Sequence, residues 1–325
     1  MKIIFRIIFI IFFSSFVFSG CNEKSKNINF RIGFNTWVGY GPFYIAKEKG
    51  FFQDEGLNVD LIRIEGTGDR RAALIGNRIE ALGSTVDDFV IGLSQGLNGK
   101  MVLMVDASQG GDGIIVKQNI NSVKDFKNKK IGVQPGFVSH FFLLSLLDKY
   151  GIPADSVTIV ALEPDAAAAA IYNNEIDVAV TWEPNLSAVK NHTNYKLLLT
   201  TKDSIARDII VDNLIVRDDI DDEKIRKVNR AWFRAISYMQ TNREDALAII
   251  SKNFSLEKGE LSNMLSGVHF PSLQENKVFF EKKALDLAKD AQRLYTQSQI
   301  INGTPYNLQN LNTRITASYL GEEDK

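Results

Sequence analysis

The chain has 325 residues, enough for about two domains of roughly 150 residues each after its first residues are set aside. Its 38 basic residues are balanced by 39 acidic ones, so no excess of positive charge points to nucleic acid. The single cysteine excludes an internal disulfide, so the stability of the folded chain depends on its apolar core.

The first 20 residues have the features of an export signal. Lys2 and Arg6 are basic, and residues 3–13 form an otherwise apolar run that is shorter than a membrane span. Cys21 then stands where a lipoprotein cysteine receives its lipid, and residues 21–29 include a polar tether. We therefore expect a signal peptide at 1–20 and an exported protein, anchored by lipid on Cys21 to the periplasmic or extracytoplasmic face of a membrane. The alternative is an ordinary cleaved signal with an incidental cysteine.

From residue 30 onward, short apolar strands alternate with helices. Arg31–Phe34 predicts a strand, Pro42 begins a helix that Gly50 ends, and Leu57–Ile64 predicts the next strand. Later strands of this unit are expected at 79–84 and 101–106. Such a βαβ opening builds an open sheet whose ligand crevice lies beyond the carboxyl ends of the strands.

The same pattern restarts near residue 114. The expected strands are 131–133, 158–162 and 178–181, and the expected helices are 139–150, 166–173 and 184–191. A strand at 214–217 then returns to the first unit, and the helices that follow are 223–240, 245–253, 256–265 and 276–297. We predict an α/β fold with two lobes, each a mixed central sheet flanked by helices, and a two-strand hinge. Lobe 1 comprises 30–113 and 213–325, and lobe 2 comprises 114–212.

The candidate ligand-binding residues follow the predicted strands and would lie at the edge where the crevice opens. They are Thr36, Trp37, Tyr40, Thr85, Asp87, Asp88, Asp112, Ser139, His140, Trp182, Glu183 and Asp212. Trp182 offers a flat apolar wall or a face for a cation, although core packing is an alternative. Asp87 is expected to cap a helix, which leaves Asp88 to face the crevice and favours a ligand with an amine or other donors.

The remaining candidates each have a structural alternative. Asp112 and Asp212 suit turns in the hinge as well as ligand contact, and Glu183 suits a helix N-terminus. Ser139 is a possible helix cap beside amides that would bind a sulfonate or carboxylate, and His140 is expected to line the crevice or pack. Arg70 and Arg71 are expected to be solvated, and contact with an anion at the turn of the first lobe is the alternative.

Enzyme functions lack their required residues in this sequence. It has no phosphate-binding glycine loop followed by lysine, no serine in a nucleophile elbow and no second cysteine. No histidine, cysteine or acidic residue lies at metal-ligand spacing beside His140. We therefore expect no catalytic residue, no metal and no cofactor.

Five sequence phrases resemble those of one protein family. They are GPFYIAKEKGFFQDEGLNV, VDASQGGDGIIV, DFKNKKIGVQPG, IDVAVTWEP and IARDIIVDNLIV, in the same order. They are similar to substrate-binding proteins of ABC importers in the nitrate/sulfonate/bicarbonate and taurine group, which are NMT1/THI5-like. The resemblance implies a type II periplasmic-binding-protein fold. It also implies a monomeric protein that delivers a small solute to permease and ATPase subunits.

The ligand is left open among several classes by the sequence. An amino-sulfonate such as taurine is favoured, because it would use helix amides at one end and acidic residues at the other. A pyrimidine thiamine precursor, held by Trp37, Tyr40 and Trp182, is the alternative within the class. The other alternative is a subunit that reports ligand to a membrane sensor instead of importing it.

Overall fold

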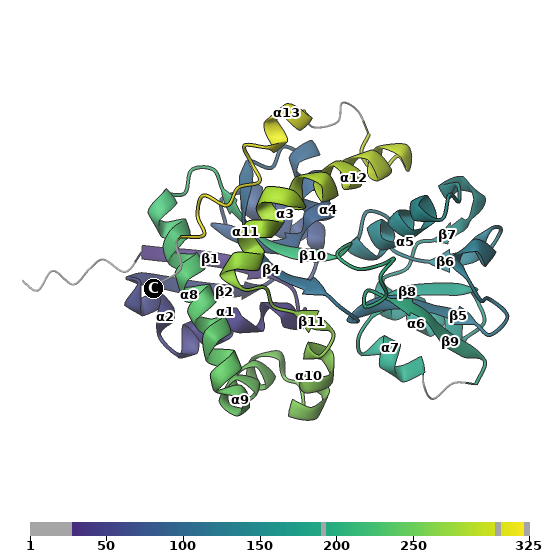
Figure 1. Cartoon of the computed structure of the whole chain (residues 1–325), viewed down its shortest axis with the longest axis horizontal. Helices are drawn as coiled ribbons and strands as arrows, with labels where there is room; N and C mark the ends of the chain where they lie inside the picture. Colours follow the sequence, from purple (N-terminus) through teal and green to yellow (C-terminus); the bar gives the residue numbers. More distant parts are fainter. Residues whose placement is uncertain (1–27, 190–192, 303–306, 322–325) are drawn as a thin grey trace, which may run out of the picture.

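The computed structural model describes residues 28–189, 193–302 and 307–321. These residues form two α/β units that lie side by side, each built around its own sheet (Figure 1). The expected signal peptide and Cys21 lie outside the described residues. Within the described ranges, no helix is both long and apolar enough to cross a membrane.

The first sheet has six strands in the order β11–β4–β10–β3–β1–β2. Its members are β1 (Ile28–Phe34), β2 (Leu57–Arg63), β3 (Ala81–Thr85), β4 (Gly99–Ser108), β10 (Val211–Arg217) and β11 (Val268–His269). Strand β1 pairs in parallel with β2 and β3, whereas β10 runs antiparallel to β3 and β4. The mixed sheet predicted for this unit is therefore confirmed.

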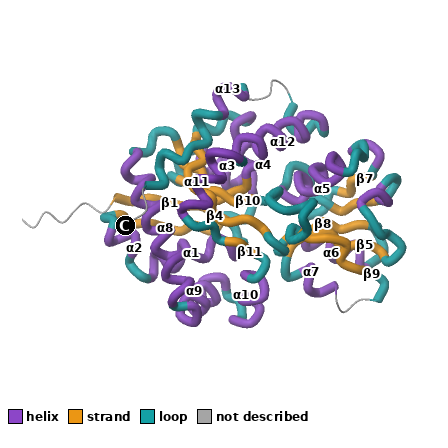
Figure 2. Tube along the Cα trace, viewed as in Figure 1, coloured by secondary structure: helices purple, strands orange, loops and turns teal. Residues whose placement is uncertain are grey.

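Helices surround this first sheet, as Figure 2 shows. From the first part of the chain come α1 (Gly41–Glu48), α2 (Phe51–Asp54), α3 (Thr67–Ile75) and α4 (Val86–Ser94). From the last part come α8 (Asp222–Thr241), α9 (Arg243–Phe254), α10 (Lys258–Leu265), α11 (Leu273–Lys282), α12 (Ala284–Gln297) and α13 (Leu308–Leu311). The rings of Phe43 and Trp232 pack at 4.5 Å between α1 and α8, so the two chain segments share one apolar core.

The single helix expected at 276–297 was wrong, because the chain bends at Lys283 and forms two helices. Helix α11 packs on β4 through Asn276, whose side chain bonds the backbone of Met104, whereas α12 packs on α4. Two different surfaces must be covered, so tertiary packing overrides a continuous helical pattern that contains neither glycine nor proline.

The second sheet has five strands in the order β7–β6–β8–β5–β9. They are β5 (Asp112–Lys117), β6 (Lys130–Gly132), β7 (Thr158–Val160), β8 (Val178–Trp182) and β9 (Tyr195–Thr200), with helices α5 (Val138–Lys149), α6 (Pro164–Tyr172) and α7 (Asn185–Ala188). Strand β5 is antiparallel to β8 and β9, and β6 is parallel to β7 and β8. This sheet is also mixed, as predicted.

Two segments connect the sheets. The chain passes from β4 to β5 through residues 109–111 and returns from β9 to β10 through residues 201–210. The hydroxyls of Ser108 and Thr201 lie 2.8 Å apart, and Thr201 Oγ1 also accepts a hydrogen bond from the Gly110 amide. The two crossings therefore contact each other through Ser108, Gly110 and Thr201.

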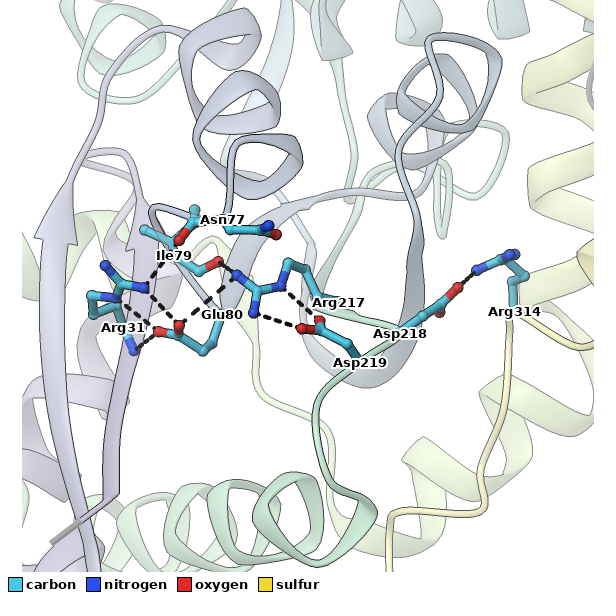
Figure 3. Close-up of polar contacts among 8 residues, drawn as sticks. All are labelled: Arg31, Asn77, Ile79, Glu80, Arg217, Asp218, Asp219 and Arg314. Atoms are coloured by element: carbon cyan, nitrogen blue, oxygen red, sulfur yellow. Dashed lines mark hydrogen bonds and ion pairs between the residues drawn. The ribbon is translucent and has the colours of Figure 1, made fainter.

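A polar network holds the edge of the first sheet at which β3 begins (Figure 3). The Glu80 carboxylate forms an ion pair with Arg31 of β1 at 2.7 Å. It also lies 3.9 Å from the guanidinium of Arg217, at the end of β10. Arg217 also pairs with Asp219 at 2.8 Å. These ion pairs join β1, β3 and β10 where β3 begins. The opposite end of β3, at Thr85, carries none of these ion pairs.

Candidate ligand-binding cleft

A cavity of about 310 Å³ lies between the two units. Its walls include the ends of β3 and β8, the starts of β5, β10 and α5, and the segment that leads from β1 to α1. Nine of the twelve predicted residues line it: Thr36, Trp37, Tyr40, Thr85, Asp88, Asp112, Trp182, Glu183 and Asp212. The structure thus brings together residues from both sheets, as the crevice rule predicts.

Asp212 lies at the centre of the first-sheet wall. On β10 it faces Thr85 of β3 on one side and Asp106 of β4 on the other. The Tyr40 hydroxyl donates a hydrogen bond to its carboxylate, and both side chains are buried. Burial raises the pKa of Asp212, although the hydrogen bond from Tyr40 and the charge of Arg70 oppose that rise.

Asp106 forms a second buried carboxylate beside Asp212. Its two oxygens lie 3.3 and 3.1 Å from Trp37 Nε1, which donates to them. Burial, and then the negative charge of Asp212, raise the pKa of Asp106 well above its ordinary value. Any side chain at position 39 would overlap this carboxylate, which explains the glycine of the Trp37–Tyr40 loop.

Asp112 and Trp182 are cross-strand partners on β5 and β8 in the second sheet. Asp112 is 4% exposed, and burial raises its pKa to about 7, against an opposing hydrogen bond from Ser108. Trp182 is half-buried, and its ring lies 5.8 Å from that of Phe137 at the start of α5. A flat aromatic wall therefore stands beside a carboxyl group that gains or loses its proton near neutral pH.

Asp88 is less free than the sequence suggested. It accepts hydrogen bonds from Arg71 and from Ser84, and it is 3% exposed. Arg71, which was expected to be solvated, is instead held in this buried ion pair. The carboxylate lines the cavity, but two donors already neutralise and orient it.

Asp87 does not cap its helix and does not line the cavity, so both parts of that prediction were wrong. The helix begins after Thr85, whose side chain makes no capping hydrogen bond. Asp87 points instead to Tyr295 of α12, whose hydroxyl donates to Asp87 Oδ2 at 2.7 Å. A residue 208 positions away supplies this partner, so no local sequence signal reveals it.

Ser139 and His140 also lie outside the cavity, inside the first turns of α5. Phe137 is the residue at the helix start, and the buried Ser139 hydroxyl has no hydrogen-bond partner, so the expected cap is absent. His140 Nδ1 lies 3.2 Å from the Gly136 amide, which donates to it, and burial lowers the histidine's pKa to about 4. The cavity is lined at this point by Gly136, Phe137 and Val138.

Arg70 was also expected to be solvated, but it is 4% exposed and lines the cavity. It donates to the carbonyls of Ile64 and Glu65, at 2.8 and 2.7 Å, and its Nε has no hydrogen-bond partner. Among the described residues that line the cavity, it is the one basic side chain. The cleft therefore contains one buried guanidinium, and its other charged lining side chains are all acidic.

Glu183 and Thr36 have partners at the edge of the cleft. The carboxylate of Glu183 accepts from the amide and hydroxyl of Ser187, at 2.9 and 2.8 Å, so it satisfies the start of α7. The Thr36 hydroxyl lies 3.1 Å from a carboxylate oxygen of Glu65, to which it donates. These contacts agree with the structural alternative for Glu183.

The list of candidate ligand-binding residues drawn from the sequence did not include several other lining residues. They are Asn35, Thr67, Arg70, Ser84, Gly136, Phe137, Val138, Asp165, Pro184, Ile210, Phe254, Leu256, Glu260 and Met264. The last four of these come from the helical segment after residue 250. No strand end precedes them, so the rule that selected the other candidates does not reach them.

The fold and cleft define the class of the protein. Two sheets joined by two crossings, with a cavity lined from both, form the periplasmic-binding-protein fold. The structure of the periplasmic aliphatic sulphonate binding protein SsuA from Escherichia coli matches with a TM-score of 0.74 and 17% identity, over 90% of this chain and 99% of that one. The fold predicted from the sequence is thus confirmed.

The family follows from sequence comparison. The model of the family described as NMT1/THI5 like matches residues 37–246, so the chain belongs to that family. A putative aliphatic sulfonates-binding protein of Bacillus subtilis is 28% identical over 255 residues, 76% of this chain and 75% of the relative. The taurine-binding periplasmic protein of Escherichia coli is 27% identical over 170 residues, 51% of this chain and 52% of the relative. The expectation of a solute-binding protein and not an enzyme is confirmed by these relatives.

Proposed function

We propose that this protein is the exported solute-binding subunit of an ABC importer and captures a small organic solute in the cleft between its two units. The observation that carries the proposal is the cavity itself, because its walls come from both sheets. A solute in it contacts both units at once. The functions in the names of the relatives support the same role.

The mechanism is a shift between open and closed arrangements. We take the lobes as 30–113 with 213–325, and 114–212, joined by the two crossings. A solute held by both lobes binds the closed arrangement more tightly and so increases its population. A change from mostly open to mostly closed requires a difference of about 5 kcal/mol in binding free energy, so both lobes must contribute contacts. The importer's permease then recognises the closed form.

For the ligand we propose a short amino-sulfonate or a similar solute. Asp112 and Asp212 would receive its ammonium group, because two buried carboxylates gain most from a positive partner. The sulfonate would bind the uncapped amides at the start of α5, where Phe137 and Val138 line the cavity. The unpartnered Nε of Arg70 is a further donor for it. Trp182 would cover the aliphatic part.

The proposal includes an anchored location and defined partners. Lipid on Cys21 would tether a monomer to the membrane, on its periplasmic or extracytoplasmic face, close to the permease and ATPase subunits. Because the described fold begins at Ile28, the residues between Cys21 and β1 would form a short link to that anchor.

The test is a thermal-unfolding screen with matched probes. Taurine and 1-propanesulfonate are similar in size and share the sulfonate, but only taurine has an amine. A solute at about 100 times its dissociation constant adds roughly 2.7 kcal/mol of stability, or a few degrees of melting temperature. We expect a shift with taurine, a smaller one with 1-propanesulfonate, and none with nitrate.

The variant Asp112→Asn is the matched control for the amine. It should reduce the taurine shift toward that of 1-propanesulfonate, because the amide removes one of the two charges that receive the ammonium group. A shift with a pyrimidine alone would replace the amino-sulfonate with a thiamine precursor as the ligand. Equal shifts with taurine and 1-propanesulfonate in the wild-type protein would refute the acidic subsite.

A further inference from the structure

Helix α12 connects the two units behind the cleft. It packs on α4, which follows β3 of the first sheet, and on α5, which follows β6 of the second (Figure 1). Both of these helices begin at the cavity, through Thr85 and Phe137. The exposed contact between α12 and α5 is a two-bond ion pair, in which Arg293 lies 2.9 and 2.8 Å from the Asp148 oxygens. The buried contact is Tyr295.

The Tyr295 hydroxyl lies between two acceptors from different units. Its oxygen is 2.7 Å from Asp87 Oδ2 on α4 and 3.1 Å from the carbonyl oxygen of Phe137 at the start of α5. The side chain of Tyr295 is fully buried and that of Asp87 is 2% exposed, so water is excluded from both. Phe137 lines the cavity, and its ring lies 5.8 Å from that of Trp182. The tyrosine therefore reaches the aromatic wall of the cleft.

The protonation state of Asp87 decides which of the two acceptors receives the hydrogen bond from Tyr295. A tyrosine hydroxyl has one hydrogen, and neither a carboxylate nor a carbonyl oxygen can donate. With Asp87 ionised, the hydrogen goes to the carboxylate, which is the stronger acceptor, and the Phe137 carbonyl loses its link to α12. With Asp87 protonated, the carboxyl donates to the tyrosine oxygen and the tyrosine donates to Phe137, so the chain of hydrogen bonds is complete.

We propose that Tyr295 is a positioning residue that joins the two units behind the cleft, and that a proton on Asp87 completes the link to the cleft wall. This goes beyond solute binding, because it concerns the unliganded protein. The link would favour the arrangement in which Phe137 and Trp182 face the first sheet, and it would weaken as pH rises.

The groups around Asp87 support a change in the physiological range. Burial raises the pKa of Asp87 to about 6, hydrogen bonds from Thr85 and Tyr295 oppose the rise, and Asp88 adds to it. Arg71 on α3 and Asp212 on β10 also act on this group of residues. From α5, the ring of His140 lies 6.2 Å from that of Tyr295, and its lowered pKa of about 4 keeps it neutral above pH 5.

Hydrogen exchange of the purified full chain tests the proposal without any ligand. The amides of His140 and Phe141 donate to the same Phe137 carbonyl, so peptides covering residues 134–141 report on its position. Exchange is measured at pH 5 and pH 8, and each variant is compared with wild type at the same pH. The variants are Tyr295→Phe, which removes the link, and Asp87→Asn, whose amide donates at every pH.

A matched control removes a different tyrosine–aspartate hydrogen bond. Tyr238 donates to Asp245 at 2.8 Å, and both residues lie within the first unit on α8 and α9. The control Tyr238→Phe should leave exchange at residues 134–141 unchanged. If it changes exchange there as much as Tyr295→Phe does, the tyrosine effect is general loosening and the proposal is wrong.

We expect Asp87→Asn to slow exchange of residues 134–141 about five-fold at pH 8 and to match wild type at pH 5, where Asp87 is already protonated; five-fold corresponds to one hydrogen bond of about 1 kcal/mol. Tyr295→Phe should speed exchange at pH 5 and abolish the effect of Asp87→Asn in the double variant. The proposal would be overturned if Asp87→Asn exchanged at the wild-type rate at pH 8. It would also be overturned if the double variant with Tyr295→Phe still showed the slowing.

Discussion

The charge state of Asp112 makes a quantitative prediction about stability. Its pKa is about 7 in the folded protein and 3.8 in the ordinary state, because folding takes the carboxyl group out of water. A raised carboxyl pKa means that the folded chain holds the proton to higher pH than the unfolded chain. Stability from this group is therefore highest in acid and falls as pH rises from about 4 to about 7.

The magnitude follows from the same two values. The Asp112 carboxyl group lowers the unfolding free energy by about 4 kcal/mol at pH 8. At pH 5, where most folded molecules keep the proton, it lowers the unfolding free energy by about 2 kcal/mol. Asp112→Asn carries no charge at either pH. We therefore expect the variant to gain about 2 to 3 kcal/mol relative to wild type between pH 5 and pH 8. Carboxyl groups that do not interact with Asp112 cancel, because both proteins contain them, and the variant also relieves the repulsion of Asp112 with Asp212 and Asp106.

Urea unfolding at the two pH values measures this difference. Asp165→Asn is the matched control, since Asp165 also lines the cavity but is exposed, so water already stabilises its charge. The control should show no pH-dependent gain over wild type. A stability difference between Asp112→Asn and wild type that stays constant from pH 5 to pH 8 would refute the buried environment assigned to this carboxylate.

Three further predictions follow from the cleft and the N-terminus. Trp182→Ala should weaken taurine binding ten-fold or more, from the loss of roughly 1.4 kcal/mol or more of contact, and calorimetry with a thermal melt should show weak binding by a folded protein. Asp88→Ala should instead lower the unfolding free energy by about 3 to 5 kcal/mol, because Arg71 is left buried without its partner; a denaturant titration showing wild-type stability would contradict this. Cys21→Ala should release the exported protein from the membrane fraction, and an unchanged membrane share on immunoblots would argue against lipidation.

Sequence reasoning predicted the fold well because its signals are local. Pro42, Gly50 and the apolar strands each mark an element through backbone chemistry within a few residues. The order of those elements then limits the possible topologies, so the mixed sheets and the crossings could be expected. The break at Lys283 could not, because it depends on which distant surfaces α11 and α12 cover.

The cleft was predictable for residues at the ends of strands, and less so elsewhere. Trp182, Asp112 and Asp212 are placed by the register of the strands that carry them. The direction of a side chain at a helix start depends on its hydrogen-bond partner. Asp87 points toward Tyr295, which is 208 positions away in the sequence. Arg70 is buried because two carbonyls of the preceding turn accept its hydrogens, which composition alone does not reveal.

The path of the chain has a consequence for the order in which its two units fold. Strands β4 and β10 are neighbours in the first sheet, yet the whole second sheet is inserted between them in sequence. As the chain emerges from the N-terminus, β10 and the later helices arrive last, so the second unit has all its strands before the first unit has its central one. We expect the inserted second unit to become compact before the first unit does. The first unit stays incomplete, with unpaired edges on β3 and β4, until the chain as far as residue 217 can add β10 between them. We expect the new chain to be most exposed to aggregation and proteolysis during that interval.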